Sequence, residues 1–337
     1  MSDTQQTIAD FDIDTFKSLL HTPSELLNYI NKYDSIDIIF NDNIARLNND
    51  ILKIIIDKCK NLEAQNDIKW RPIHYICRYS TPEMIRYIVD KGVNLEAQDD
   101  IKWRPIHIIC RYSTPEMIRY IIDKGCQLEA QTNNRWRPIH FICTYSTPEM
   151  IRYIIDKGVD LEANTNTNWR PIHYICRYST PEMIRYIIDK GVDLEAHAID
   201  GLRPIHLICI FSTPEMIRYI INKGVDLEAQ ALNKFRPIHL ICEHSTPKMI
   251  RYIVDKGVDL EAKDNMHWRP LHYICRYSTP KMFRYIVNKG VNLKAKTMSH
   301  LTAIDLIRLR STPDMKKYLV NIGGDFNFPY NSSIRLL

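Results

Sequence analysis

Several features common in other classes of protein are missing from this sequence of 337 residues. It contains no apolar run of about 18 residues, so we expect no membrane-spanning segment. Its first residues, MSDTQQTIADFDIDTF, include four Asp and no apolar stretch, so they do not have the pattern of a signal peptide. Together these absences predict a cytoplasmic protein, or a protein of the nucleus.

A large excess of charge of one sign is also missing. Lys and Arg outnumber Asp and Glu by 45 − 40 = 5, which is too little to indicate a nucleic-acid binder by itself. The sequence lacks a phosphate-binding glycine loop, a nucleophile elbow, a catalytic acid pair and a zinc-protease motif. We therefore predict that the protein is not an enzyme and that it uses no cofactor and no metal.

What the sequence does contain is one phrase that returns many times. Residues 70–92 read WRPIHYICRYSTPEMIRYIVDKG, and close copies follow at a fixed step of 33 residues. The Pro of the R-P-[IL]-H motif marks that step at Pro72, Pro105, Pro138, Pro171, Pro204, Pro237 and Pro270. A fixed period of about 20–50 residues is typical of an array of small structural units rather than of one globular core.

Each copy is predicted to form two short helices, near 72–79 and 82–90 in the first copy, with negligible strand. Pro72 suits the first position of a helix, where its missing N–H costs nothing. Trp70 and Tyr75 have the spacing of a hydrophobic staple around that start. Ser80 or Thr81 can cap the second helix, and a Gly follows its end. Helices this short are stable only when they pack against neighbouring copies.

These residues resemble the ankyrin repeat. The segment RPIHYICRYSTPEMIRYIVDKGVNLEAQD, residues 71–99, aligns without gaps to the family pattern of T-P-L-H, a second helix ending in Gly, and a hydrophobic-N-A tail. The resemblance implies an all-α ankyrin-repeat solenoid of helix-turn-helix units. The phrasing, rich in Ile, Asn, Lys and Tyr, is also similar to ankyrin paralogues of giant DNA viruses of amoebae and of AT-rich protists.

The resemblance also divides the chain into ranges. Residues 34–66 resemble a degenerate repeat, because ILKIIIDKCKNLEAQ aligns with MIRYIVDKGVNLEAQ. Residues 1–33 are expected to be an N-terminal helical extension or cap, residues 298–330 a degenerate C-terminal capping repeat, and residues 331–337 a tail. Seven full repeats are expected between these ends, at 67–99, 100–132, 133–165, 166–198, 199–231, 232–264 and 265–297.

Two departures from the family pattern concern local structure. Arg replaces the Thr before the first Pro in all seven copies, from Arg71 to Arg269, which removes a capping hydroxyl. The Gly of the tip between repeats is present only at Gly201, and its place is otherwise taken by Lys69, Lys102, Arg135, Asn168, Lys234 and His267. The geometry of the tips is therefore the part of the repeat that the resemblance leaves open.

The pair His74-x-x-Cys77 recurs in every full repeat and could offer two zinc ligands on one helix face. Neighbouring helices lie about 8–10 Å apart, too far for a second repeat to complete one zinc site. The same spacing is too long for disulfides between the recurring cysteines, so buried free thiols in a reducing compartment are expected. The resemblance implies that the His is a structural hydrogen-bonding residue.

The copies differ from one another mainly in the tips and on the first helix. The resemblance implies that these positions line a concave face that binds a partner, although unconstrained loops would vary in the same way. The tip tryptophans could instead be occupied entirely as staples. The candidate partner-binding residues are Asp100, Trp103, Arg111, Asn133, Trp136, Asn166, Trp169 and Arg177.

Charge is distributed unevenly along the chain. On the second helix Glu83, Arg86 and Asp90 are expected to compensate one another. Residues 265–297 contain seven Lys or Arg and no Asp or Glu, whereas residues 1–66 contain six against eleven. This basic repeat could bind an acidic partner or nucleic acid, or it could simply be solvated. The candidate basic patch is Arg269, Arg276, Lys281, Arg284, Lys294 and Lys296.

We therefore predict a monomeric, non-catalytic scaffold that binds a protein partner on its concave face. The alternative is a binder of nucleic acid or of an acidic partner, which would use the repeated arginines and the tip tryptophans. No membrane partner is expected.

Overall fold

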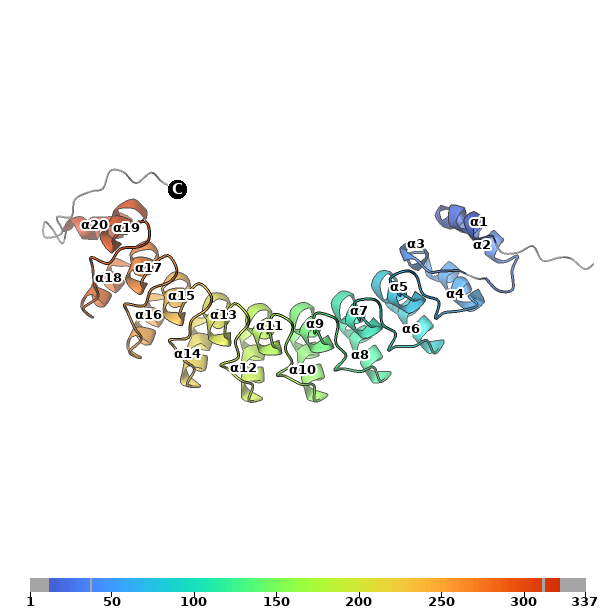
Figure 1. The fold of residues 1–337 in the computed structure, drawn as a ribbon, viewed down its shortest axis with the longest axis horizontal. Coiled ribbons are helices and arrows are strands. Elements are labelled where there is room, and N and C mark those ends of the chain that lie inside the picture. Colours follow the sequence, from blue (N-terminus) through green and yellow to red (C-terminus); the bar gives the residue numbers. More distant parts are fainter. Residues whose placement is uncertain (1–11, 37, 311–312, 322–337) are drawn as a thin grey trace, which may run out of the picture. The chain divides into compact units, whose positions relative to one another are not determined.

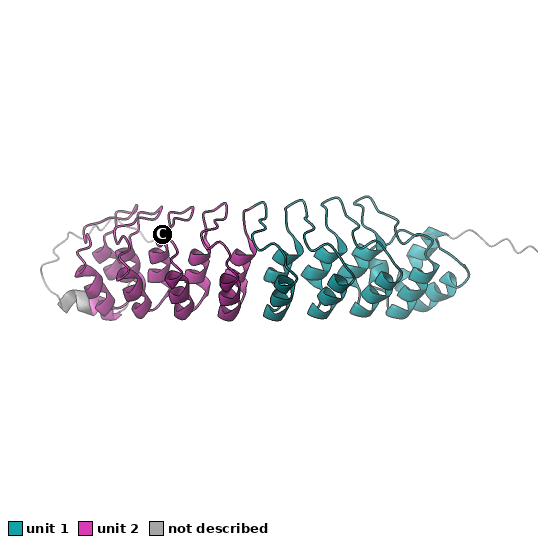
Figure 2. Cartoon of the chain, turned by 90° about the horizontal axis from the view of Figure 1, so that it is seen from below, with its two compact units in different colours: residues 1–166 teal, residues 167–337 magenta. Residues whose placement is uncertain are grey.

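The computed structural model describes residues 12–36, 38–310 and 313–321. These residues form short helices joined by turns, and their only strand-like contacts are two isolated pairs, Ile36 with Cys59 and Lys296 with Thr302. The repeated helix pairs and the all-α content confirm the predicted fold class. The chain divides into two compact units, residues 1–166 and residues 167–337 (Figure 2).

The first unit opens with helices outside the regular pattern. They are α1 (Ile13–Ser18), the 3-10 helix η1 (Leu19–His21), α2 (Pro23–Ile30), α3 (Asp42–Ala45) and α4 (Asn49–Lys58). Three regular pairs follow (Figure 1), which are α5 (Pro72–Tyr79) with α6 (Pro82–Asp90), α7 (Pro105–Tyr112) with α8 (Pro115–Asp123), and α9 (Pro138–Tyr145) with α10 (Pro148–Asp156). Contacts of α2 with α4, of α3 with α5 and of α4 with α6 continue the stacking toward the N-terminal end of this unit.

The second unit consists of helix pairs throughout its described residues. They are α11 (Pro171–Tyr178) with α12 (Pro181–Asp189), α13 (Pro204–Phe211) with α14 (Pro214–Asn222), α15 (Pro237–His244) with α16 (Pro247–Val254), α17 (Pro270–Tyr277) with α18 (Pro280–Val287), and α19 (Ala303–Arg310) with α20 (Pro313–Asn321). In each unit the first helix of a pair packs on its own second helix and on the first helix of the next pair. The predicted helices at 72–79 and 82–90 are confirmed at both ends.

The starts of the two helices in a pair are capped in different ways. Thr81 is the N-cap of α6, and its hydroxyl accepts the Met84 N–H, so of the two candidate residues the Thr is the cap. At the start of α5 no capping hydroxyl is present. The Arg71 N–H donates instead to Nδ1 of His74 at 3.0 Å, and the His74 N–H, which a capping hydroxyl would accept, donates to the Arg71 carbonyl at 2.9 Å.

The same His also fixes the tail of its repeat. Nε2 of His74 lies 3.2 Å from the Ala97 carbonyl, and His107 to His272 repeat both contacts in the other full repeats. Because Nδ1 accepts a hydrogen bond, the proton must sit on Nε2, and no lone pair remains for zinc. The structural role implied for this His is confirmed. Within the described residues no group of three or more His, Cys, Asp or Glu is placed to hold a metal ion.

The tips keep the family's backbone although they lack its Gly. The residues in that place adopt a left-handed conformation, with φ of 60° at both Lys69 and Lys102 and 56° at Lys234, beside 73° at Gly201. Each tip is also joined to the preceding one, because Asp100 N–H donates to the Ile68 carbonyl at 3.2 Å. Left-handed geometry costs a non-glycine residue about 1–2 kcal/mol, so contacts between tips must offset that cost.

The interior of each pair is apolar and includes the recurring thiols. All nine cysteines are free, and eight of them are buried, with only Cys59 partly exposed. Burial raises the pKa of every thiol in the recurring series and raises the pKa of Cys126 to about 12. These thiols therefore act as small apolar side chains.

The last pair departs from the pattern at its start. Thr302 precedes α19, and Asp305 accepts both the N–H and the hydroxyl hydrogen of that Thr, while the Thr hydroxyl accepts the Asp305 N–H. This reciprocal pair replaces the Arg–His arrangement of the other repeats. Lys316 and Lys317 on α20 are exposed, as a wet terminal face requires. None of the described helices is long and apolar enough to cross a membrane.

Candidate partner-binding face

The tips and the last turns of the first helices share one surface. Figure 2 shows the tips of each unit projecting together on one side of the helices. We call this surface the tip face. In the first unit its exposed side chains include Ile68, Asp100, Ile101, Arg111, Tyr112, Asn133 and Tyr145. In the second unit they include Arg177, Tyr178, Ile199, Phe211, Leu232, Met266 and Tyr277.

Three of the candidate binding residues form a row along the tips of the first unit. Asp100 pairs with Lys69 at 3.2 Å. Asn133 donates from Nδ2 to the Asp100 carbonyl at 3.4 Å, and Asn166 donates in the same way to the Asn133 carbonyl at 3.3 Å. All three side chains are exposed, so this row is both a set of links between tips and an accessible polar edge.

The candidate tryptophans are half-buried and act as staples. In the first unit the Phe141 ring lies between two of them, with its centroid 5.0 Å from that of Trp103 and 4.8 Å from that of Trp136. In the second unit Trp169 packs on Tyr174 at 5.0 Å. The predicted staple spacing is confirmed, and most of each indole is used within the protein.

The candidate arginines are exposed and stack on aromatic rings. The Arg111 guanidinium lies 5.7 Å from the Trp103 ring and 5.5 Å from the Tyr145 ring of the next repeat. In the second unit Arg177 lies 5.9 Å from the Trp169 ring and 5.4 Å from the Phe211 ring. Each arginine therefore holds a tip tryptophan and the next repeat together while leaving its charge at the surface.

One group of positions expected on this face is not there. The variable residues five positions after Trp70 and its equivalents are all buried. They are Tyr75, Ile108, Phe141, Tyr174, Leu207, Leu240 and Tyr273. They form the inner half of the staples, so their variation reflects packing beneath the tips. The expectation that they are exposed on the binding face was wrong, although Tyr273 lines a pocket there.

The face also contains exposed residues that were not among the candidates predicted from the sequence. Ile101 at a tip is 53% exposed, and Tyr145 at the end of α9 is 51% exposed. The signal for the tyrosines was present, because an aromatic residue ends nearly every first helix, outside the set that the helix periodicity buries.

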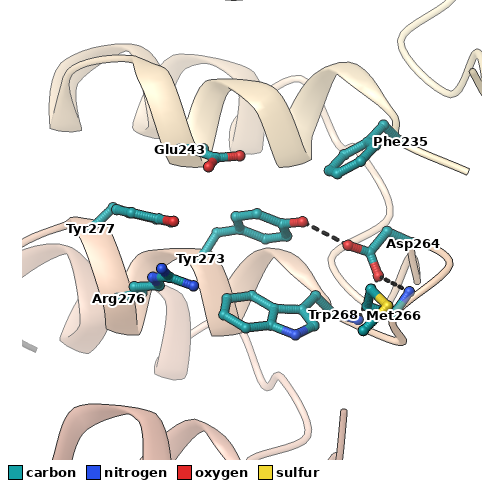
Figure 3. A pocket seen from close by; sticks show the side chains of 8 residues that line it. All are labelled: Phe235, Glu243, Asp264, Met266, Trp268, Tyr273, Arg276 and Tyr277. Carbon is teal, nitrogen blue, oxygen red and sulfur yellow. Dashed lines mark hydrogen bonds between the residues drawn. The ribbon is translucent and has the colours of Figure 1, made fainter. Parts of the chain in front are cut away.

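The second unit contains a pocket of about 290 Å³ on this face, between the pairs α15–α16 and α17–α18 (Figure 3). Its apolar lining comes from Phe235, Met266, Trp268, Tyr273 and Tyr277. Glu243, Asp264 and Arg276 supply its polar lining.

Hydrogen bonds fix one end of this pocket. The Tyr273 hydroxyl donates to Oδ2 of Asp264 at 2.6 Å, and Oδ1 of Asp264 accepts the N–H groups of Met266 and Trp268 at 2.8 and 2.7 Å. Burial, the bond to Asp264 and the charges of Asp264 and Glu243 raise the pKa of Tyr273, so its hydroxyl stays protonated. The carboxylate of Asp264 is thereby held in place at the tip end of the pocket.

Comparison with known proteins decides the family. The sequence profile described as "Ankyrin repeats (3 copies)" matches residues 43–132, 128–198 and 205–297, which is most of the chain. This chain belongs to the ankyrin-repeat family. The solved ankyrin repeat domain of Bcl-3, described as a unique member of the IkappaB protein family, is similar with 17% sequence identity and a TM-score of 0.49, over 65% of this chain and 98% of that chain. No curated protein sequence matches the chain.

The opposite surface of these ankyrin repeats, which we call the helix-two face, is made by the exposed side chains of the second helices. Arg86 lies over the Tyr120 ring of the next repeat at 4.6 Å. The Tyr120 hydroxyl donates to Asp90 at 2.9 Å, and Lys124 pairs with Asp90 at 2.8 Å. Hydrogen bonds from Lys124 and Tyr120 lower the pKa of Asp90, and the charge of Arg86 on the same helix contributes least. The expectation that Asp90 is compensated mainly by Arg86 of its own helix was therefore wrong. Its main partners, Tyr120 and Lys124, come from the next repeat.

The same cross-repeat pattern recurs along each ankyrin unit. Arginine lies over tyrosine again at Arg119 with Tyr153, Arg185 with Tyr219, Arg218 with Tyr252 and Arg251 with Tyr285. This repetition gives a physical reason for the nearly constant sequence of the second helices. Each of those residues has a partner one period away.

The candidate basic residues of the repeat at 265–297 do not share one surface. Arg269 lies at the start of α17 and faces Glu261 at 3.2 Å, whereas Arg276 lies in the last turn and stacks on Trp268 at 5.6 Å. Lys281 and Arg284 are exposed on α18. Lys294 and Lys296 are exposed in the segment that follows that helix.

Proposed function

We propose that this ankyrin-repeat chain is a non-catalytic scaffold that binds a protein partner on its tip face, the surface that the family resemblance implies to be concave. Ankyrin repeats are generally protein–protein interaction modules and typically non-catalytic. The observation that carries the proposal is the contrast between the two faces of each repeat. The helix-two face repeats one set of internal contacts, whereas the tip face exposes apolar and aromatic side chains that differ from repeat to repeat.

The exposed composition of the tip face suits a protein partner. Tyr and Arg side chains are enriched among residues that dominate binding energy, and here Tyr112, Tyr145 and Arg111 occur together. Apolar tip residues such as Ile68 and Ile101 stand beside the polar row of Asp100 and Asn133. Apolar centres with polar edges are characteristic of protein interfaces.

The alternative of nucleic-acid binding through the repeated arginines has less support. The arginines before each first helix are engaged by glutamates of the tail, as with Arg71 and Glu63 or Arg104 and Glu96. Arg137 in addition pairs with Asp160 at 3.0 Å. A guanidinium shared by one or two carboxylates is poorly placed to neutralise a phosphate.

We further propose that the scaffold acts as a monomer in a reducing compartment, the cytoplasm or nucleus. The support is the set of buried free thiols, which would be exposed to oxidation during folding elsewhere. The similarity of phrasing to viral and protist ankyrin proteins extends this proposal to a viral protein in the cytoplasm or nucleus of a host cell.

The test is capture of partners by two matched triple variants. The tip variant carries Asp100→Ala, Asn133→Ala and Asn166→Ala, and the control carries Glu116→Ala, Glu149→Ala and Glu182→Ala, which are exposed on second helices. Proteins retained by the wild type and the control, identified by mass spectrometry, should be lost or captured at least about tenfold less by the tip variant, since interface truncations often cost 1–2 kcal/mol each. Equal capture by both variants would contradict binding on the tip face. Each partner is then confirmed with purified proteins by calorimetry.

A further inference from the structure

One variable position on the first helix lies at the pocket of the second unit. This position is Arg in four of the seven full repeats, Thr144 and Ile210 in two others, and Glu243 in one. In three of the four, the guanidinium lies over the ring that ends the first helix of the next repeat. Arg78 lies 4.4 Å from the Tyr112 ring, Arg111 lies 5.5 Å from Tyr145, and Arg177 lies 5.4 Å from Phe211. At these steps the chain places a guanidinium between two neighbouring first helices.

At one repeat the same position is Glu243. The next repeat still offers the aromatic ring, Tyr277, which is 44% exposed. A carboxylate is shorter than a guanidinium and is repelled by the face of a ring. The space that Arg78, Arg111 and Arg177 fill at their repeats is here part of a pocket of about 290 Å³, with Glu243 on α15 facing Tyr273 and Tyr277 on α17 (Figure 3).

The charge of this pocket is the reverse of the charge at the corresponding sites. Among the described residues no Lys or Arg lies within 4.0 Å of the Glu243 carboxylate, and its one pairing within that limit is with Nε2 of His244 at 3.7 Å. Asp264 holds a second carboxylate at the tip end. Arg276 lines the pocket too, but it lies over its own repeat's Trp268 and Tyr277 at 5.6 and 4.9 Å.

A second cation can be accommodated beside that arginine, as the first unit shows. There the Tyr112 ring has Arg78 of the preceding repeat at 4.4 Å and Arg111 of its own repeat at 5.2 Å. Arg276 corresponds to Arg111, and Glu243 stands in the place of Arg78. The pocket thus combines aromatic walls with a carboxylate that has no Lys or Arg partner among the described residues. Its volume suits one long side chain, since pockets for whole drug-sized ligands are about 300–1,000 Å³.

We propose that this pocket binds the guanidinium of an arginine side chain supplied by the protein partner. The inference rests on the proposed function, because the arginine would be carried by the protein bound on the tip face. The planar group would stack on the Tyr277 ring and donate two parallel hydrogen bonds to Glu243. A lysine ammonium would pair with the carboxylate, but it could neither stack on the ring as a planar group nor donate two parallel hydrogen bonds. A phosphate would meet the two carboxylates and be repelled.

The experiment uses the full chain with ¹³C-methyl methionine and a short peptide as the probe. The peptide acetyl-Gly-Ser-Arg-Ser-Gly-amide is titrated against the same peptide with citrulline, which keeps the shape of arginine and removes its charge. We expect the Met266 methyl signal, which reports from the pocket lining, to shift with the arginine peptide. Binding of the citrulline peptide should be about tenfold weaker, since a desolvated cation–π contact contributes about 1–2 kcal/mol.

Two variants provide the controls. Glu243→Arg introduces the residue that four other repeats carry here, so it should fill the pocket and abolish the Met266 shift without lowering the melting temperature. Glu243→Gln keeps the size and should weaken the arginine peptide about tenfold. Equal binding of the arginine and citrulline peptides, no shift with either peptide, or an unchanged shift in Glu243→Arg would each overturn the inference.

The same proteins separate this inference from the proposed function. If the tip variant loses its partners while the arginine peptide leaves Met266 unmoved, the pocket assignment fails and the scaffold function stands. If the tip variant keeps every partner, the scaffold function fails on that face regardless of the peptide result.

Discussion

The helix-two face and the tip face are built on the same repeated backbone but use their side chains differently. On the helix-two face Arg86, Asp90 and Tyr120 form contacts that recur one period later with almost no change of sequence. On the tip face the arginine of one repeat becomes Glu243 in another, and an aromatic contact becomes a pocket. Side chains that contact the same residue of the next copy must keep the same sequence in every repeat. Side chains on the tip face have fewer such contacts, so their sequence can differ between repeats.

The largest effect expected concerns the histidines beneath the tips. Burial lowers the pKa of His107, His140 and His173 to about 4, below the ordinary value of 6.5. Between these values the unfolded chain binds more protons than the folded chain, so stability is full above pH 6.5 and falls as the pH drops toward 4. The loss should reach up to about 1.4 kcal/mol per pH unit for each histidine.

Urea denaturation at pH 7.5, 6.5, 5.5 and 4.5 measures this effect. The carboxylates of the helix-two face, such as Asp90, Asp189 and Asp255, have pKa values lowered by tyrosine and lysine hydrogen bonds and lose their stabilisation only at still lower pH. The window between pH 6.5 and 5.5 therefore reports on the tip side of the repeat, because glutamates of the second helices, such as Glu116, have a pKa lowered from 4.5 and contribute only below it. A constant urea midpoint across that window would show that the histidines are not held neutral.

The staple tryptophans should give the next largest effect. Trp136→Ala removes a ring that lies 4.8 Å from Phe141 and 6.0 Å from His140. Because the indole is half-buried, the free energy of unfolding should fall by about 2–3 kcal/mol in urea titrations. Asn133→Ala in the same tip is the control and should change it by less than about 0.5 kcal/mol. If the two variants are equally stable, the tryptophan belongs to the binding surface and not to the staple.

Exchanging Gly and Lys at two tips should change the stability by a smaller amount, upward in one variant and downward in the other. Lys102→Gly relieves a left-handed residue with φ of 60° and should stabilise the protein by about 1 kcal/mol, after the greater freedom of Gly in the unfolded chain is deducted. Gly201→Lys should destabilise it, because a Cβ there would lie 3.0 Å from the Gln230 carbonyl oxygen. Melting temperatures of both variants check the pair. A stabilising Gly201→Lys would mean that tip strain is negligible.

The smallest effect is expected on the helix-two face. Arg185→Ala removes a guanidinium 4.3 Å from the Tyr219 ring, at an exposed site where such contacts contribute about 0.5 kcal/mol. Urea titration should show a loss of this size, with Arg152→Ala on the preceding repeat as a parallel measurement. A loss as large as that of Trp136→Ala would reverse the comparison between the two faces.

Much of the fold followed from local chemistry in the sequence. Pro72 and Pro82 marked the helix starts, and Thr81 was available as a cap, because these effects act within a few residues. The role of His74 followed from the family pattern and not from its own neighbours in sequence.

What the sequence could not reveal depends on contacts one period away. The left-handed conformation of Lys69 is sustained by hydrogen bonds within its tip and between tips, which no local propensity encodes. Arg86 was assigned to a carboxylate on its own helix because a helix periodicity shows only that helix. Glu243 appeared in the sequence only as one residue at a position that also holds Arg, Thr and Ile, and its place beside a pocket becomes visible only when neighbouring first helices are seen together.

The step of nearly constant length between partners, such as the 30 residues that separate Asp90 from Tyr120, has a consequence for how such a chain evolves. Removing or duplicating one whole period brings together two ends that already fit, because the new neighbours are copies of the old ones. Unequal recombination between repeats therefore leaves the contacts between neighbouring repeats unchanged, so the number of repeats can change during evolution without loss of the fold. A repeat that has acquired a distinctive residue, as at Glu243, is the kind of unit whose loss selection can detect.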